Sequence, residues 1–321
     1  MSDDRPNLLE IRNLVVDFAT AGGVVRAVAG VDFHVKQGET LGLVGESGCG
    51  KSTTARAIMQ LPRPTSGQVL LDGEDLTAVD PKRMRALRQR LQIVFQDPIA
   101  SLNPRMRVAD IVGAPLKVNG VGTAAEREQK VRDMLDAVGL DPKVAWDKRP
   151  HEFSGGQCQR MSIARALILE PEVLVCDEPV SALDVSIQAQ ILNLLEDMKE
   201  HYSLTMLFIS HDLAVLKSVA DRVAVMYLGK VCEVAPSESL YADPKHPYTR
   251  ALLSAIPIPD PAVKPRQPDL IDGELPSPMN PPSGCVFHTR CPQAEDRCSQ
   301  VVPALRVLAD GREIACHLVA D

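Results

Sequence analysis

The sequence is organised around residues 45–52, Gly45-Glu46-Ser47-Gly48-Cys49-Gly50-Lys51-Ser52, which read G-x-x-x-x-G-K-S. The apolar run 41–44 before them suits a buried strand, and residues 53–59 after them contain few helix breakers. This strand–loop–helix context is the one in which the motif binds phosphate. Glycines let backbone N–H groups surround an anion, and the helix that starts at Lys51 adds the positive end of its dipole. We therefore predict a phosphate-binding P-loop rather than a glycine-rich turn that only resembles one.

The P-loop residues have separate predicted roles. Lys51 reaches the β- and γ-phosphates of a nucleotide, and the hydroxyl of Ser52 coordinates Mg²⁺. The rest of the loop and the first residue after it surround the phosphates: Gly45, Glu46, Ser47, Gly48, Cys49, Gly50 and Thr53.

Composition places the chain among ordinary globular proteins. Its 321 residues are 45% hydrophobic and 24% charged, which is enough for one large domain or about two of ordinary size. The net charge of −7 disfavours nucleic acid as a partner. Neither a membrane span nor a signal peptide is expected, so we predict a cytosolic location. Eight cysteines in that compartment are not expected to form a disulfide framework.

The N-terminal region has the alternation of paired strands. Residues 9–18 and 24–35 alternate between apolar and polar positions, and residues 21–23 form the turn of a hairpin. Phe18 lies at the end of the first strand. It either stacks on an adenine base or packs in the core, and the sequence does not separate the two.

Residues 68–160 continue the α/β pattern and then change character. A strand at 68–73, a basic helix at 81–90 and a buried strand at 91–95 precede Gln96. The Gln96 amide is predicted to contact Mg²⁺ and to sense the state of the nucleotide; the alternative is a polar residue at a strand end. From about 98 to 160 we predict a helical insertion, which includes an amphipathic helix at 124–138.

A second glycine-rich stretch begins another helix. It reads Ser154-Gly155-Gly156-Gln157, so backbone N–H groups and a helix dipole face outward there as well. By itself this stretch is equally explained as an ordinary helix cap.

The next apolar strand, 173–178, ends in two acids. Asp177 is placed to hold Mg²⁺ through water, and Glu178 is placed to polarise the attacking water, although adjacent acids often form only a solvated turn. A loop at 181–184 ends at Asp184, and another buried strand, 204–210, leads to His211.

These motifs, taken in order, resemble the ABC-type ATPases over about residues 8–245. The resemblance implies an α/β P-loop NTPase fold with an antiparallel β subdomain and a helical insertion. It also implies ATP and Mg²⁺, with His211 contacting the γ-phosphate. Two ATPase domains would pack head to tail, so that the P-loop of one faces a second set in the other: Ser154, Gly155, Gly156, Gln157 and Asp184. Phe153 and Cys158 depart from the commonest family pattern, but neither removes a catalytic group.

Three stretches are similar to the ATPases of oligopeptide/dipeptide importers: 96–105, 177–186 and His246-Pro247-Tyr248-Thr249-Arg250-Ala251-Leu252-Leu253. The similarity implies a peripheral subunit on the cytoplasmic face of the membrane. Its expected partners are two membrane-spanning permease subunits, a second and unlike ATPase subunit, and an extracytoplasmic solute-binding protein. A nickel or other small-solute importer is an alternative. Two alternatives come from other functional classes. One is a soluble ABC ATPase that acts on nucleic acid or the ribosome. The other is a metal-binding or redox protein whose main function lies in its C-terminal tail, with the ATPase as a regulated partner.

Residues 246–321 form a proline-rich extension that we predict to be irregular and rich in turns. Cys285, Cys291, Cys298 and Cys316 within it are spaced C-x₅-C-x₆-C-x₁₇-C. A metal is the natural cross-link in the cytosol, and the wide spacing suits a [4Fe–4S] cluster better than zinc. The resemblance of this tail to the C-terminal tails of the peptide importers also implies an iron–sulfur cluster. Zinc, with His288 or His317 as a further ligand, and free thiols are the alternatives.

Overall fold

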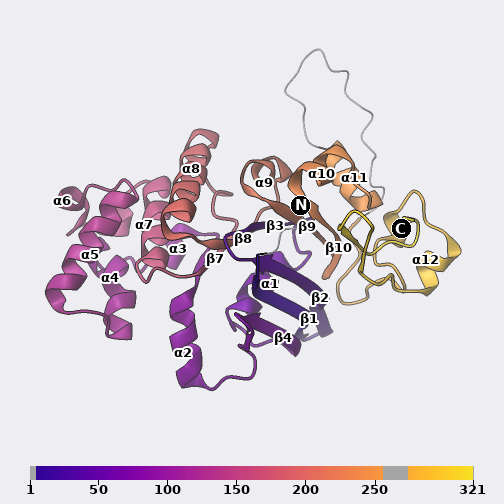
Figure 1. The fold of residues 1–321 in the computed structure, drawn as a ribbon, viewed down its shortest axis with the longest axis horizontal. Helices are drawn as coiled ribbons and strands as arrows, with labels where there is room; N and C mark the ends of the chain where they lie inside the picture. Colours follow the sequence, from indigo (N-terminus) through magenta and orange to yellow (C-terminus); the bar gives the residue numbers. More distant parts are fainter. Residues whose placement is uncertain (1–4, 256–273, 321) are drawn as a thin grey trace, which may run out of the picture. The chain divides into compact units, whose positions relative to one another are not determined.

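A computed structural model describes residues 5–255 and 274–320 of the chain (Figure 1). The chain is divided into two compact units. The first unit comprises Met1–Ala78 and Ser210–Asp321, and the second comprises Val79–Ile209. Each unit combines sheet and helix, and the P-loop belongs to the first.

An antiparallel sheet in the first unit has the strand order β2-β1-β4-β5. Strands β1 (Asn7–Thr20) and β2 (Gly23–Lys36) form the predicted hairpin, and β4 (Ser66–Leu71) and β5 (Glu74–Asp75) extend it. The apolar positions of β1 that alternate in the sequence, such as Leu9 and Leu14, are fully buried. The prediction of an antiparallel β subdomain is therefore confirmed.

The other strands of the first unit lie in the order β11-β12-β10-β9-β3. Strand β3 (Thr40–Val44) is buried along its whole length and pairs in parallel with β9 (Arg222–Tyr227). Strand β10 (Lys230–Pro236) turns back antiparallel to β9. Because β3 is surrounded, its carboxyl end presents the P-loop from a fixed support, and helix α1 (Lys51–Ile58) begins directly after that loop.

The C-terminal extension is mostly turns, as predicted, but it also completes this sheet. Two strands of two residues each, β11 (Arg306–Val307) and β12 (Glu313–Ile314), pair with each other, and β12 pairs with β10. Among the described residues, the extension also has the short helices α11 (Pro247–Ser254), η2 (His288–Arg290) and α12 (Asp296–Gln300). Two further short helices, α9 (Leu213–Val219) and α10 (Ser237–Ala242), precede the extension.

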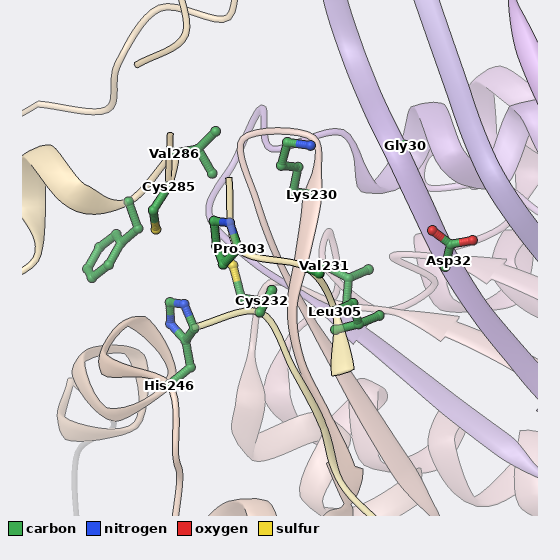
Figure 2. A pocket seen from close by; sticks show the side chains of 13 residues that line it. Gly30, Asp32, Lys230, Val231, Cys232, His246, Cys285, Val286, Pro303 and Leu305 are labelled. Atoms are coloured by element: carbon green, nitrogen blue, oxygen red, sulfur yellow. The ribbon is translucent and has the colours of Figure 1, made fainter. Parts of the chain in front are cut away.

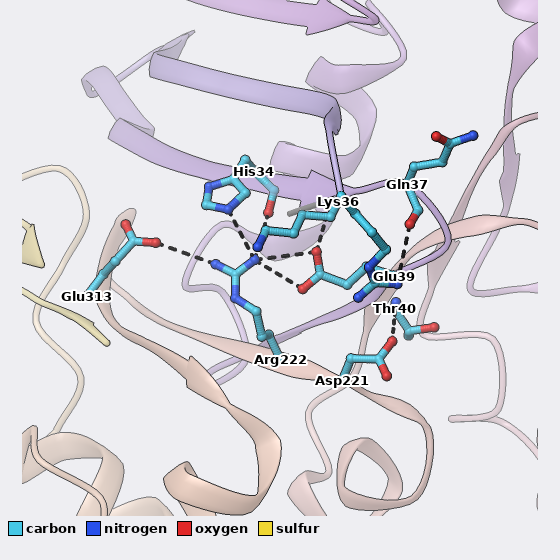
Figure 3. Close-up of polar contacts among 9 residues, drawn as sticks. His34, Lys36, Gln37, Glu39, Thr40, Asp221, Arg222 and Glu313 are labelled. Carbon is cyan, nitrogen blue, oxygen red and sulfur yellow. Dashed lines mark hydrogen bonds and ion pairs between the residues drawn. The ribbon is translucent and has the colours of Figure 1, made fainter. Parts of the chain in front are cut away.

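One arginine links the extension to the start of β3 (Figure 3). Arg222 of β9 donates to the carboxylate of Glu39 at 3.0 Å and to that of Glu313 in β12 at 3.4 Å. Glu39 is fully buried, so Arg222 supplies the charge that a buried carboxylate requires. Beside it, the Asp221 carboxylate accepts a hydrogen bond from the backbone N–H of Thr40 at 2.7 Å. The extension is thus held to the strand that presents the P-loop.

The second unit is built on three parallel strands in the order β8-β7-β6. These are β6 (Leu91–Val94), β7 (Val173–Asp177) and β8 (Thr205–Ile209), and every residue of β7 and β8 is buried. Helix α2 (Pro81–Arg90) precedes β6 as predicted, and α8 (Val185–Tyr202) joins β7 to β8. Asp177 therefore ends, and Glu178 follows, a strand held from both sides.

Between β6 and β7 the chain is helical, as the sequence predicts. The elements are α3 (Pro98–Ser101), α4 (Val108–Asn119), α5 (Ala124–Ala137), α6 (Pro142–Ala145), η1 (Pro150–Glu152) and α7 (Gly155–Leu167). Helix α5 begins at a capping box, in which Thr123 and Glu126 exchange side-chain and backbone hydrogen bonds. In the part of the chain that the structure describes, no helix combines the length and the apolar character needed to cross a membrane.

Candidate active site

The P-loop lies between β3 and α1, and two of its glycines meet other backbone at close range. A Cβ atom on Gly45 would lie 2.0 Å from the carbonyl oxygen of Met226, and one on Gly50 would lie 2.3 Å from that of Ala27. Gly50 also has a φ of 106°, in the left-handed region that favours glycine. The loop therefore fits against its support only because these two positions have no side chain.

Lys51 is buried and its ammonium group is turned into the loop. Its Nζ donates to the carbonyl oxygens of Gly45 at 2.7 Å and Glu46 at 3.0 Å. The cation is thus held within the curve of the backbone, where phosphate oxygens bind in loops of this type. Ser52 and Thr53 are half-buried in the first turn of α1, close to the positive end of the helix dipole.

Phe18 and His211 are the other candidates in the first unit. The Phe18 side chain is 39% exposed, so the alternative of a core aromatic is wrong, and the ring is accessible for stacking. His211 is exposed and directly precedes Asp212, the N-cap residue of α9. The side chain of Asp212 accepts from the backbone N–H of Ala214 at 2.7 Å, which fixes the turn that displays His211.

In the second unit the structure brings together two predicted catalytic residues. The side-chain amide of Gln96, just after β6, donates to the carboxylate of Glu178, just after β7, at 3.0 Å. Glu178 has a φ of 47°, which is uncommon for a residue with a side chain and is frequent at functional sites. Asp177, at the end of β7, is fully buried. A polar edge of parallel strands therefore carries the residues predicted for Mg²⁺ and for water activation.

The second glycine-rich stretch does cap a helix. Ser154 is the N-cap of α7: its Oγ accepts from the backbone N–H of Gln157, and the Gln157 side chain accepts from the backbone N–H of Ser154. The Ser154 hydroxyl serves as an acceptor in this capping box, so its own proton is still available to a ligand. Ser154, Gln157 and Asp184 are exposed. The capping role and the predicted phosphate-binding role are therefore compatible.

The two glycines of this stretch differ in the space around them. A Cβ atom on Gly156 would lie 2.6 Å from Cγ2 of Ile187, whereas one on Gly155 would make an ordinary contact of 3.6 Å with Leu183. Ile187, on α8, is half-buried against this stretch. Gly156 is thus required for packing, and Gly155 is the position at which a side chain can be tolerated.

The two departures from the common family pattern fit into the same unit. Cys158 is buried in the first part of α7, and its thiol donates to the carbonyl oxygen of Pro150 at 3.5 Å. Phe153 is half-buried, with the Lys148 ammonium 5.7 Å from the centre of its ring. Neither contact involves a residue predicted to bind nucleotide.

One thiol of the extension, that of Cys285, lines a cavity of about 190 Å³ (Figure 2). The lining also includes His246 and Cys232 of β10, a cysteine outside the extension. Burial raises the pKa of Cys285, and the nearby thiols of Cys316, Cys298 and Cys291 raise it further. Burial and neighbouring thiols likewise raise the pKa of Cys232. Cys285 therefore has the other three cysteines of the extension near it, and Cys232 lies with it in the cavity wall.

These thiols do not form a ready-made metal site. Within residues 5–255 and 274–320, no three or more His, Cys, Asp or Glu side chains are arranged to hold one metal ion. His288 bonds the carbonyl oxygen of Cys285 through Nδ1 at 2.8 Å, and His317 bonds that of Val301 through Nε2 at 2.8 Å. One ring nitrogen of each imidazole is thus engaged with the backbone.

Two residues that the motifs did not indicate contact the P-loop. The hydroxyl of Tyr248 in α11 accepts from the backbone N–H of Glu46 at 3.0 Å. The guanidinium of Arg290, at the end of η2, pairs with the Glu46 carboxylate at 2.9 Å. Tyr248 lies in one of the stretches that suggested the subfamily, but no local pattern connects either residue with the P-loop.

Comparison with known families and structures agrees with these features. Residues 28–181 match the family described as ABC transporter, and residues 232–298 match the oligopeptide/dipeptide transporter, C-terminal region. The oligopeptide transport ATP-binding protein AppF of Bacillus subtilis is 49% identical over 325 residues, which cover 98% of both chains.

Two solved structures resemble the ATPase part of the chain. The ATP-binding cassette MJ0796, solved as a dimer in a post-hydrolysis state with ADP and Pi, has a TM-score of 0.65 and 28% identity, covering 71% of this chain and 98% of that one. The cbiO1 protein of Clostridium perfringens, part of the ABC transporter complex cbiONQ, has a TM-score of 0.65 and 30% identity, covering 74% of this chain and 91% of its own.

Proposed function

This chain belongs to the ABC transporter ATP-binding proteins that carry the oligopeptide/dipeptide C-terminal region, and we propose that its ATP hydrolysis powers the import of di- and oligopeptides. The proposal includes a peripheral position on the cytoplasmic face of the membrane. The observation that carries the ATPase part is the pairing of Gln96 with Glu178 at the end of parallel strands, in a chain whose P-loop lysine is already held inside its loop.

We assign the chemistry of hydrolysis as follows. ATP lies on the P-loop, with Lys51 and the backbone N–H groups on its phosphates and Phe18 against its base. Ser52, Gln96 and, through water, Asp177 would hold Mg²⁺, which would supply positive charge to neutralise the phosphates. Glu178 accepts a proton from the attacking water, and the amide of Gln96 orients its carboxylate. His211 contacts the γ-phosphate.

The second helix N-terminus completes the site from another subunit. Each chain carries two helix N-termini whose N–H groups can bind phosphate, one at α1 and one at α7. In the proposed arrangement, each ATP uses the α1 N-terminus of one subunit and the α7 N-terminus of the other. We propose that Ser154, Gly155, Gly156, Gln157 and Asp184 close over ATP bound to a second ATPase subunit, one unlike this chain. The structure of the cassette MJ0796 as a dimer with ADP and Pi supports the pairing of two ATPase subunits. Two permease subunits and an extracytoplasmic binding protein would complete the transporter.

Purification of the intact complex tests this function. We expect two membrane-spanning subunits to co-purify with this chain, and the complex in proteoliposomes to take up short peptides when ATP is present. A matched complex with Glu178→Gln is the control for ATP-driven uptake. Uptake of Ni²⁺ in place of peptides would reassign the solute, and co-purification of ribosomes or nucleic acid without membrane subunits would contradict the importer.

For the extension we propose that the thiols of Cys285, Cys291, Cys298 and Cys316 hold a [4Fe–4S] cluster. The grouping of these residues supports it: the backbone N–H of Cys285 donates to the carbonyl oxygen of Cys298 at 2.7 Å, and burial together with neighbouring thiols raises the pKa of Cys285, Cys291 and Cys316. A bound cation would stabilise thiolates that share this space. The described side chains do not converge on one point, so ligation would require their rotation. The cluster has a structural role in this proposal, since no step of hydrolysis uses it.

Anaerobic purification of the full chain with elemental analysis tests the cluster. We expect about four iron and four sulfide per chain, together with a visible absorption band. Cys298→Ser should abolish both, whereas Cys158→Ser, which alters a buried thiol of the second unit, should retain them. Iron-free protein with about one zinc ion per chain would establish zinc instead. Metal-free protein with four titratable thiols in the extension would overturn both alternatives.

A further inference from the structure

We infer that the C-terminal extension is part of the nucleotide site. Tyr248 bonds the backbone N–H of Glu46 and Arg290 pairs with its carboxylate, and together they position the P-loop for ATP. The inference rests on ATP occupying the P-loop, as proposed above, and goes beyond it by assigning two positioning residues outside every ATPase motif. All the residues involved lie in the first unit.

Glu46 has each of its polar groups bonded. Its backbone N–H donates to the Tyr248 hydroxyl at 3.0 Å, and its carbonyl oxygen accepts from Lys51 Nζ at 3.0 Å and from the backbone N–H of Cys49 at 3.2 Å. Its carboxylate accepts from Arg290 Nη1 at 2.9 and 3.2 Å. The carbonyl is thus held from within the P-loop, while the N–H and the carboxylate are held by the extension.

Arg290 supplies charge at a position where water is scarce. Its side chain is 10% exposed, and that of Glu46 is 26% exposed. Nη1 also lies 3.3 Å from the Tyr227 hydroxyl, while Nε is buried with no hydrogen-bond partner among the described residues. Burying a cation with an unbonded N–H is unfavourable unless a charged partner offsets it, and Glu46 is that partner.

The scaffold behind these contacts is an aromatic cluster, defined here as Tyr227, Tyr248 and Phe287. The three rings are fully buried, with centroids 4.7 Å apart for the two tyrosines and 5.2 and 5.3 Å from Phe287 to each of them. Tyr227 ends β9, Tyr248 lies in α11, and Phe287 directly precedes η2. The hydroxyl and the guanidinium that hold Glu46 therefore project from a rigid packing rather than from mobile loops.

The consequence for ATP follows from charge. An unpaired carboxylate at Glu46 would stand within the phosphate-binding loop and repel a polyanion, and Arg290 removes that repulsion by pairing with it. The Tyr248 hydroxyl keeps the first turn of the loop in one conformation, which lowers the ordering cost when phosphate binds. Both effects act on affinity for ATP, and neither touches the transferred phosphate. They should appear in Kd and KM and leave kcat at saturating ATP nearly unchanged.

A double-mutant cycle on the full-length protein tests this, with binding of a fluorescent ATP analogue measured at equilibrium and hydrolysis measured in the assembled transporter. We expect Arg290→Ala to raise the Kd roughly five- to tenfold, less so at high salt. In a Glu46→Gln background the same Arg290→Ala change should alter the Kd by less than about twofold, because no carboxylate is then left unpaired. Tyr248→Phe should raise the Kd about threefold through loss of one hydrogen bond.

Arg312→Ala is the matched control. Arg312 is also an extension arginine with a 10% exposed side chain, but it pairs with Asp310 and Asp243 instead of the P-loop. Arg312→Ala should therefore leave the Kd unchanged.

An Arg290→Ala variant that binds the ATP analogue with wild-type affinity would overturn the inference. So would an Arg290→Ala change that weakens binding equally in the wild-type and Glu46→Gln backgrounds. If Arg290→Ala fails to fold, Arg290→Lys, which keeps the charge, should fold with a Kd near that of the wild type; a fivefold rise there would also overturn it. Lys51→Ala separates the two proposals: if it still binds ATP normally, the P-loop assignment itself fails.

Discussion

Replacement of Glu178 by glutamine is expected to reduce ATP hydrolysis by on the order of 10²–10⁴-fold while ATP binding is retained. The amide has nearly the size of the carboxylate, and its oxygen can still accept the hydrogen bond that Gln96 donates at 3.0 Å. What is lost is the basic group that takes the proton from water. The P-loop is untouched, so ATP should bind and then persist, and it should hold two ATPase subunits together. Single-turnover hydrolysis and equilibrium binding on the same preparation measure the two effects separately.

Glu172→Gln provides a matched control for this experiment. Glu172 directly precedes β7, at the opposite end of the strand from Glu178, and its carboxylate pairs with Arg90 at 2.6 Å. The same loss of charge there should leave hydrolysis close to the wild-type rate, because this end of the strand carries none of the proposed catalytic residues. Near-normal turnover by Glu178→Gln in the assembled transporter would mean that another residue is the base.

Gly155→Asp should reduce hydrolysis by on the order of 100-fold, with unchanged ATP affinity for the mutated subunit itself. The new carboxylate would stand at the N-terminus of α7, where the proposed function brings in the γ-phosphate of ATP bound to the partner. Position 155 is suitable because a Cβ there meets Leu183 only at an ordinary 3.6 Å. Gly156→Asp would combine the charge effect with a clash against Ile187 at 2.6 Å, so its result could not be attributed to charge.

Gly155→Asn separates charge from size at this position. Asparagine has almost the shape of aspartate without the negative charge, so it should retain most of the activity. If Asn and Asp are equally inactive, the loss comes from bulk, and repulsion of phosphate is not its cause. If Gly155→Asp weakens ATP binding to the isolated, folded subunit, then α7 acts on the nucleotide of its own chain and the proposed exchange between subunits is wrong.

The local features of this chain could be predicted because each is written in neighbouring residues. The strand before the P-loop, the helix after it, the hairpin of β1 and β2 and the amphipathic helix α5 follow from apolar period and turn residues. Gln96 and Glu178 were each predicted at the end of a buried strand. Parallel strands place their carboxyl ends on the same edge of a sheet. For this reason the two residues, 82 positions apart in the sequence, form one hydrogen bond.

The sequence was less informative where a pattern is short or admits two environments. Phe18 was equally compatible with core and surface, because one aromatic at a strand end has no periodicity of its own, and only the structure shows it exposed. Strands β11 and β12 have two residues each, so no alternation exists to detect, and they form because β10 offers them an edge. The structure also places Cys232 beside Cys285 of the extension, in the lining of one cavity. Its position on β10 brings it there, and no sequence spacing indicates this.

By itself, then, the sequence determined the ATPase motifs, their order and the elements that present them, since short-range sterics and apolar period decide those. Only the tertiary structure decided what surrounds the P-loop. The carbonyls of Met226 and Ala27 leave no room at Gly45 and Gly50, and Arg290 reaches Glu46 across 244 residues of chain. Contacts between residues so far apart in the sequence depend on how the sheets and the extension pack together. The residues next to Glu46 or Arg290 in the sequence therefore give no indication that the two side chains meet.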